Sequence, residues 1–215
     1  MFCGTDDNLS KEHVLPKWVF EGCSKKFFIT TINNSEQTYN KTTIKACKYC
    51  NSEILSSLER YIKRLFEKYK DIAFDLNDEE IGDIICWLEV IEYKFQILDM
   101  RRKFLKYSGS DFIPYLRNLP IAIMASEDSP SKILTLFRKA LKNISVKNKT
   151  SKINSLVLFK TKNQGFHFFH KTNDFIFLEL PKYKIALFYF FDRKFITNRE
   201  AYEEAIKIIK KQYSS

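Results

Sequence analysis

The sequence contains no apolar run of about 18 residues, which is the least that a membrane-spanning helix requires. Its first residues also lack the basic region followed by an apolar segment that marks a secretory signal peptide. Glycine and proline are scarce, with five of each, and this scarcity argues against long flexible linkers. Together these absences predict a folded, cytoplasmic protein that does not act in a membrane.

The positive charge of the chain is confined to its C-terminal half. The 215 residues carry a formal net charge of +10. Residues 1–59 hold 7 Lys/Arg and 7 Asp/Glu, residues 60–107 hold 10 of each, and residues 108–215 hold 19 against 9. Between Ser129 and Asn173 there are ten basic residues and no acid. A field of one sign attracts a polyanion, of which nucleic acid is the commonest; a solvated basic face is the alternative.

Two short segments hold the chemically distinctive residues. Residues 9–18 read Leu-Ser-Lys-Glu-His-Val-Leu-Pro-Lys-Trp, and residues 47–51 read Cys-Lys-Tyr-Cys-Asn. An acid beside a histidine places a metal ligand next to a general base, and the later segment can fold the following helix back onto that pair. In order and spacing these segments resemble the HNH endonuclease family, the ββα-metal nucleases, over roughly residues 1–60. The resemblance is to the bacterial subgroup that carries Glu-His-Val-x-Pro-Lys-Trp and later Cys-x-x-Cys-Asn.

The resemblance implies a role for each residue of the motif. His13 would be the general base, because an imidazole with an unperturbed pKa of about 6.5 can accept a proton near neutral pH. Glu12 and Asn51 would be the metal ligands, and their carboxylate and amide oxygens suit Mg²⁺ or Mn²⁺. Glu59 matches the acid at the end of the subgroup's motif, either as a further ligand or as a support behind the ligands.

Two features of the family pattern stay open. Its middle asparagine corresponds to Asn34 or to Asn40, and the sequence does not choose between them.

The cysteines leave the second feature open. Cys47 and Cys50 have the spacing of half a zinc knuckle, and Cys3 supplies a third thiolate. The subgroup's preceding cysteine would fall before the first residue, and Cys23 is not placed there by the family pattern. A structural Zn²⁺ held by an altered ligand set and a knuckle that has lost its metal are both compatible with this sequence. Cys86, on the apolar face of a predicted helix, is interpreted as a buried small residue.

Hydrophobic periodicity predicts the secondary structure. β-branched and aromatic residues predict strands over 26–32 and 42–46, which would form a hairpin ahead of a helix. Apolar residues at every third or fourth position predict helices over 52–69 and from Asn77 or Asp78 to about 107. Further helices are predicted over 112–119, 132–143 and 200–213. Aromatic-rich segments at 156–159, 165–170, 175–180 and 185–191 predict an antiparallel sheet.

The predicted fold class is α+β, with a ββα-metal (HNH) module over residues 1–70, a helical region over 71–128 and a basic α/β region over 129–215. The predicted function is metal-dependent hydrolysis of DNA phosphodiester bonds by an endonuclease, with RNA left open as a substrate. Modules of this kind occur in restriction, mobile-element and anti-phage defence proteins. The C-terminal region could instead bind a subunit that controls the nuclease, such as an ATPase.

Other interpretations compete with the enzyme. A protein that binds nucleic acid without cutting it, or a structural adaptor, could keep the zinc-knuckle frame. His167 and His170, three residues apart in a predicted strand, should point to opposite faces and not share a metal. The side chains predicted to contact phosphates are Lys17, Lys160, Lys162 and Lys171.

Overall fold

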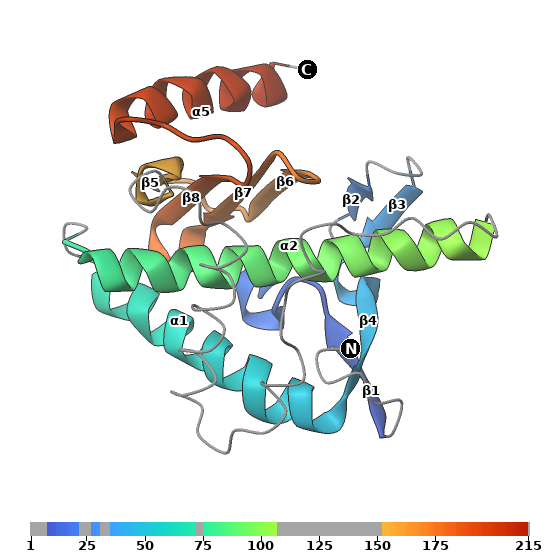
Figure 1. Ribbon diagram of the computed structural model, residues 1–215. Helices are drawn as coiled ribbons and strands as arrows, with labels where there is room; N and C mark the ends of the chain where they lie inside the picture. Colours follow the sequence, from blue (N-terminus) through green and yellow to red (C-terminus); the bar gives the residue numbers. More distant parts are fainter. Residues whose placement is uncertain (1–7, 22–26, 31–34, 72–74, 107–151, 215) are drawn as a thin grey trace.

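The computed structural model describes residues 8–21, 27–30, 35–71, 75–106 and 152–214 (Figure 1). Cys3, Cys23, Asn34 and the helices predicted over 112–119 and 132–143 lie outside these ranges. The described helices and strands are β1 (Leu9–His13), β2 (Phe27–Thr30), β3 (Ser35–Thr38), β4 (Thr43–Cys47), α1 (Ser56–Tyr69), α2 (Asp78–Lys106), β5 (Leu156–Lys160), β6 (His167–Lys171), β7 (Phe175–Leu180), β8 (Ile185–Phe190) and α5 (Asn198–Tyr213).

The N-terminal part is built on an antiparallel pair formed by β1 and β4, in which Glu12 lies opposite Ile44 and His13 opposite Thr43. From β4 the chain enters a π-helical turn, Cys50–Leu55, that continues directly into α1. A pair of strands and a helix are therefore adjacent, with β1 and β4 as the paired strands.

The expected pairing of the two predicted strands is wrong. The strand predicted over 26–32 is present as β2, but it pairs with the nearby β3, while the strand predicted over 42–46 is present as β4 and pairs with β1. The segment that contains Glu12 and His13 is itself a strand. Its polar sequence hides this, because a strand is recognised by β-branched and aromatic residues, and Leu-Ser-Lys-Glu-His has neither.

The long helix α2 begins with a reciprocal cap. The backbone N–H of Glu80 donates to Asn77 Oδ1 at 2.9 Å, and the N–H of Asn77 donates to Glu80 Oε2 at 3.1 Å, so two N–H groups that the helix itself leaves unpaired are satisfied. Every residue from Cys86 to Phe95 is buried. A helix buried on all sides must be covered by other elements all round, and α2 accordingly forms the centre of the molecule.

The C-terminal sheet has the strand order β5-β8-β7-β6, with antiparallel pairing throughout. Alternate side chains of a strand point to opposite faces, and the two faces belong to different hydrophobic clusters. Ile176, Leu178 and Leu187 join the cluster that contains the apolar side chains of α1 and α2. Phe177 and Phe188 join Ala201 and Ala205 of α5.

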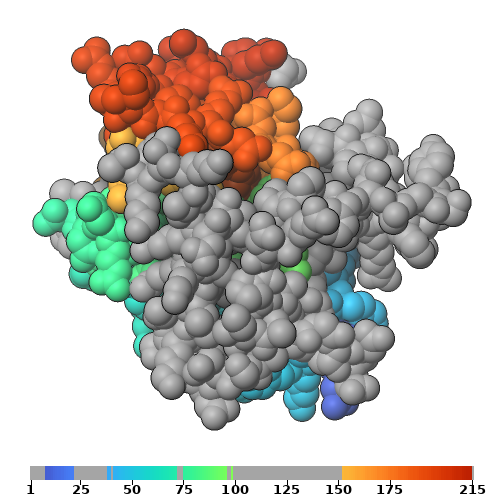
Figure 2. Space-filling view, in the orientation of Figure 1, coloured from blue at the N-terminus to red at the C-terminus, as the bar shows by residue number. Residues whose placement is uncertain are grey.

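These elements are stacked in layers (Figure 1). The β1–β4 pair and α1 lie on one side of α2, the C-terminal sheet lies on the other side, and α5 covers the outer face of that sheet. In the space-filling view of Figure 2 the C-terminal segments form one end of the molecule and the β4 and α1 region lies toward the other. The fold is of the α+β class. None of the described helices is long and apolar enough to cross a membrane.

The packing of the C-terminal sheet predicts that Phe188→Ala is strongly destabilising. The Phe188 side chain is fully buried, and its ring centroid lies 4.7 Å from that of Phe190 and 5.3 Å from that of Phe175. Truncation leaves a cavity, and we expect the free energy of unfolding to fall by about 3–5 kcal/mol in urea denaturation. Ile196→Ala, at a residue that is 86% exposed, is the control and should change it by less than about 0.5 kcal/mol.

Candidate active site

Asn51 is held against the strand that carries Glu12. Its Nδ2 donates to Ser10 Oγ at 2.9 Å and to the carbonyl oxygen of Lys11 at 3.3 Å. Ser10 and Glu12 are two residues apart in β1, so their side chains leave the same face of the strand. The π-helical turn at the start of the helix places Asn51 on this face, although 39 residues separate it from Glu12 in the sequence. The structure therefore brings these two predicted metal ligands to one face of one strand.

A lysine that the motif does not contain lies beside Glu12. The ammonium of Lys94, on α2, forms a short ion pair with Glu12 Oε1 and donates to the carbonyl oxygen of His13 at 3.2 Å and to Glu59 Oε1 at 3.2 Å. Lys94 is 1% exposed and Glu12 7% exposed. Glu12, Glu59 and Lys94 thus form a cluster, the Glu–Lys–Glu cluster, that joins β1, α1 and α2, with Glu59 partly exposed at its edge.

The charges in this cluster support one another. Burial alone lowers the pKa of Lys94, but the adjacent carboxylates of Glu59 and Glu12 outweigh burial and hold that pKa above its usual value. The side chain is therefore an ammonium. For Glu59 the balance goes the other way, since burial raises its pKa more than the charge of Lys94 lowers it. Both shifts follow from the same cause, which is the removal of charged groups from water.

His13 is the last residue of β1 and is partly exposed. Neighbouring side chains in a strand point to opposite faces, so the imidazole and the Glu12 carboxylate leave β1 on opposite sides. The His13 ring centroid lies 6.3 Å from that of Phe20. The peptide group of His13 is fixed by its hydrogen bond to Lys94, and the residue as a whole is partly exposed at the end of the strand.

The donor set available for a cation is small. Within the described part of the chain, no group of three or more His, Cys, Asp or Glu side chains is placed to hold a metal ion. Mg²⁺, however, usually keeps several waters and binds through one or two carboxylates. Glu12 Oε2 and Asn51 Oδ1 take part in no hydrogen bond among the described residues, so one carboxylate oxygen and one amide oxygen remain to fit such an ion.

The two cysteines of the second segment are packed in the interior. Cys47 ends β4 and Cys50 begins the π-helical turn, and both are buried without forming a disulfide. The backbone N–H of Cys50 donates to Cys47 Sγ at 3.3 Å. Cys86 is buried on α2, where burial raises the pKa of its thiol, and this confirms its interpretation as a small buried residue.

The lysines predicted to contact phosphates do not gather at the Glu12 face. Lys160 donates to the carbonyl oxygen of Tyr69, at the end of α1 far from Asn51. Lys171 pairs with Asp174 at 2.9 Å. Lys17 and Lys162 are exposed.

The histidines of β6 have separate partners, as their spacing predicts. His167 Nδ1 lies 2.6 Å from Glu179 Oε2, and His170 pairs with Glu92 of α2.

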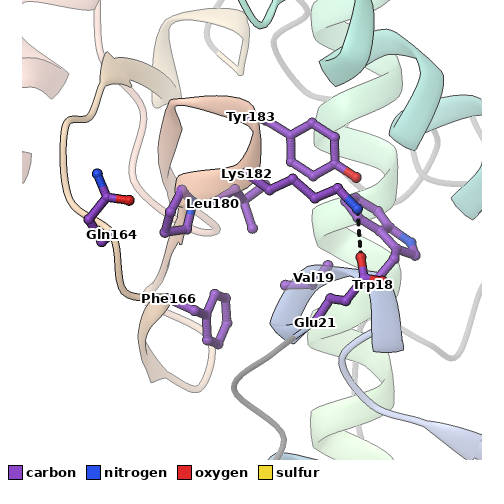
Figure 3. Close-up of a pocket in the computed structure, with 9 residues that line it drawn as sticks. Trp18, Val19, Glu21, Gln164, Phe166, Leu180, Lys182 and Tyr183 are labelled. Carbon is purple, nitrogen blue, oxygen red and sulfur yellow. Dashed lines mark hydrogen bonds and ion pairs between the residues drawn. The ribbon is translucent and has the colours of Figure 1, made fainter.

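A pocket of about 290 Å³ lies between the segment that follows β1 and the β7–β8 connection (Figure 3). Glu12, His13 and Asn51 are not among the residues that line it. Trp18, Phe166 and Tyr183 supply its aromatic walls. Glu21 and Lys182 are the charged residues among those that line it, and they pair with each other at 2.6 Å. The pocket therefore has no uncompensated charge for a ligand. Trp18 also stacks on Trp87 of α2, as a structural anchor for the motif segment.

Comparison of the chain with family models, with curated proteins and with solved structures gives no match.

Lys94 is the site residue that sequence reasoning missed. A signal for it exists, because Lys94 lies three residues after Ile91 and four before Leu98, on the apolar face of the predicted helix. A cation at such a position is buried and requires an acidic partner.

The Glu–Lys–Glu cluster predicts that Lys94→Met is severely destabilising. The substitution leaves two carboxylates close together without their cation, and removal of one partner from a buried ion pair costs about 3–5 kcal/mol. Urea denaturation measures this loss. The matched control is Lys45→Met on β4, where the lysine is exposed, and this variant should stay within about 0.5 kcal/mol of the wild type. Equal stability of the two variants would contradict the assignment of the cluster.

Proposed function

We propose that the protein is a metal-dependent endonuclease that hydrolyses phosphodiester bonds in DNA. The observation that supports this most directly is the pair of hydrogen bonds from Asn51 to β1. They hold an amide oxygen on the face of the strand from which Glu12 projects, and His13 follows Glu12 in the same strand. A pair of strands that leads into a helix is also what the resemblance implies, although the paired strands here are β1 and β4.

Glu12 and Asn51 are the residues that would hold the ion, through Glu12 Oε2 and Asn51 Oδ1. When bound, a divalent cation neutralises the charge on the phosphate and on the leaving oxygen. Mg²⁺ or Mn²⁺ fits an oxygen donor set that waters complete. Asn51 can turn its oxygen outward because its side-chain hydrogen bonds to the described residues are both made by Nδ2.

His13 would act as the general base that takes a proton from the attacking water. The imidazole does not need to bind the ion, so its position on the other side of β1 from the Glu12 carboxylate is compatible with this role. The hydrogen bond between its carbonyl and Lys94 fixes the backbone at this residue. A fixed backbone limits the orientations of the ring, and positioning of reactive groups contributes strongly to catalysis.

Nucleic acid is the substrate class that the charge distribution favours. The excess of lysine and arginine lies entirely in residues 108–215, and Lys160 and Lys162 lie in or next to β5 at one edge of the C-terminal sheet. Contacts from such lysines to phosphates position a nucleic acid without reading its sequence. The resemblance extends the proposal to a role in restriction or anti-phage defence, with control by a separate subunit such as an ATPase.

Nicking of supercoiled plasmid in Mg²⁺ or Mn²⁺ tests the proposal. We expect His13→Ala to lower the cleavage rate by about 10²- to 10⁴-fold, which is the usual contribution of a general base. The matched control is His167→Ala, which removes an imidazole paired with Glu179 in the other sheet and should cut at nearly the wild-type rate.

Binding of the same plasmid separates catalysis from association. His13→Ala should bind DNA with nearly wild-type affinity, because the substitution leaves the lysines in place. A wild-type protein that binds DNA and does not cut it with either metal would replace the nuclease by a non-catalytic binding protein. Equal cutting by the wild type and His13→Ala would remove His13 from the mechanism.

A further inference from the structure

The ammonium of Lys94 has as many acceptors as it has protons to donate. An ammonium carries three N–H donors, and Glu12 Oε1, Glu59 Oε1 and the carbonyl oxygen of His13 accept from it. Two of these acceptors belong to the Glu-His dipeptide at the centre of the proposed active site. Lys94 therefore fixes both the carboxylate of Glu12 and the peptide group that follows the proposed base.

The three charges of the Glu–Lys–Glu cluster do not cancel. With one ammonium and two carboxylates, the cluster has a net charge of −1. The ammonium contacts both carboxylates, so it compensates one negative charge, and the second negative charge remains for a cation. Without Glu59, the positive charge of Lys94 would be compensated by Glu12 alone, and Glu12 would attract a divalent ion less strongly.

Glu59 is poorly placed to share an ion with Asn51. Eight residues separate them on one continuous helix, which corresponds to a rise of about 12 Å. Their hydrogen bonds also run to different elements, since Asn51 bonds to Ser10 and Lys11 of β1, and Glu59 bonds to Lys94 of α2.

We propose that Lys94 and Glu59 are a positioning pair, in which Lys94 orients the Glu12 carboxylate and Glu59 is the counter-charge of Lys94 and not a metal ligand. This inference rests on the proposed function, because it concerns the ion that Glu12 and Asn51 would hold. It assigns a role to a lysine outside the motif, and it changes the role of the last acid within the motif.

Calorimetric titration of the 215-residue chain with MnCl₂ alone measures its affinity for Mn²⁺. The affinities of the variants distinguish a counter-charge from a ligand. Glu59→Gln should weaken Mn²⁺ binding by about tenfold. In this variant Glu12 alone compensates the positive charge of Lys94, so Glu12 attracts Mn²⁺ less strongly. The double variant Lys94→Met/Glu59→Gln removes the neutral pair together. Its Kd for Mn²⁺ should return to within about threefold of the wild-type value, because Glu12 and Asn51 are still present.

A direct ligand behaves differently in the same experiment. If Glu59 binds the ion, the double variant stays as weak as Glu59→Gln, and the inference is overturned. If Glu59→Gln alone binds Mn²⁺ like the wild type, Glu59 is neither a ligand nor a necessary counter-charge, and the inference also fails. Glu67→Gln, at an exposed carboxylate of the same helix, controls for the loss of one negative charge and should leave the Kd unchanged.

Further measurements keep these outcomes apart from loss of folding and from failure of the proposed function. Thermal unfolding shows which variants are folded. If Lys94→Met/Glu59→Gln is unfolded, the double variant Lys94→Gln/Glu59→Gln replaces it, because glutamine keeps a donor toward Glu12. Plasmid nicking shows whether positioning matters, since the double variant should bind Mn²⁺ normally but cut at least about tenfold more slowly. A wild-type protein that neither binds Mn²⁺ nor nicks DNA refutes the proposed function, and the inference with it.

Discussion

The structure depends on the placement of one ammonium in the interior. Moving a lysine side chain out of water costs several kcal/mol unless acceptors surround it, and Lys94 meets this requirement with groups from β1 and α1. The three elements must therefore approach one another in one register. Coulombic attraction in a site shielded from water is stronger than at the surface, so the same contacts also hold the Glu12 carboxylate in a defined position.

The central helix α2 transmits this constraint to the remainder of the molecule. Lys94 faces the N-terminal strands, whereas two buried acids of the same helix contact the C-terminal sheet. Glu89 accepts from Tyr189 at 2.7 Å and from Lys152 at 2.7 Å, and Glu92 pairs with His170. Polar groups inside a helix that is otherwise apolar restrict how its neighbours can pack, because each must find its own partner. One helix thus fixes the two halves of the chain relative to each other.

Local patterns in the sequence predicted most of the described fold. The helices α1, α2 and α5 follow from apolar residues at every third or fourth position, and the strands of the C-terminal sheet follow from aromatic-rich segments. The pairing of β1 with β4 could not be read in this way, because β1 is polar and its partner lies 30 residues downstream. The motif identified Glu12, His13 and Asn51, but Lys94 belongs to a helix outside it, and only three-dimensional packing brings it to Glu12.

The segment that resembles the nuclease motif is therefore smaller than the unit that makes the site. Residues 1–60 contain the acid, the imidazole and the amide, yet the cation that pairs with the buried acid comes from α2. The β1–β4 pair and the first turn of the following helix would leave Glu12 without this partner, and a buried charge needs a partner of opposite sign. The position of the motif's acid thus depends on α2, whose sequence carries no part of the motif.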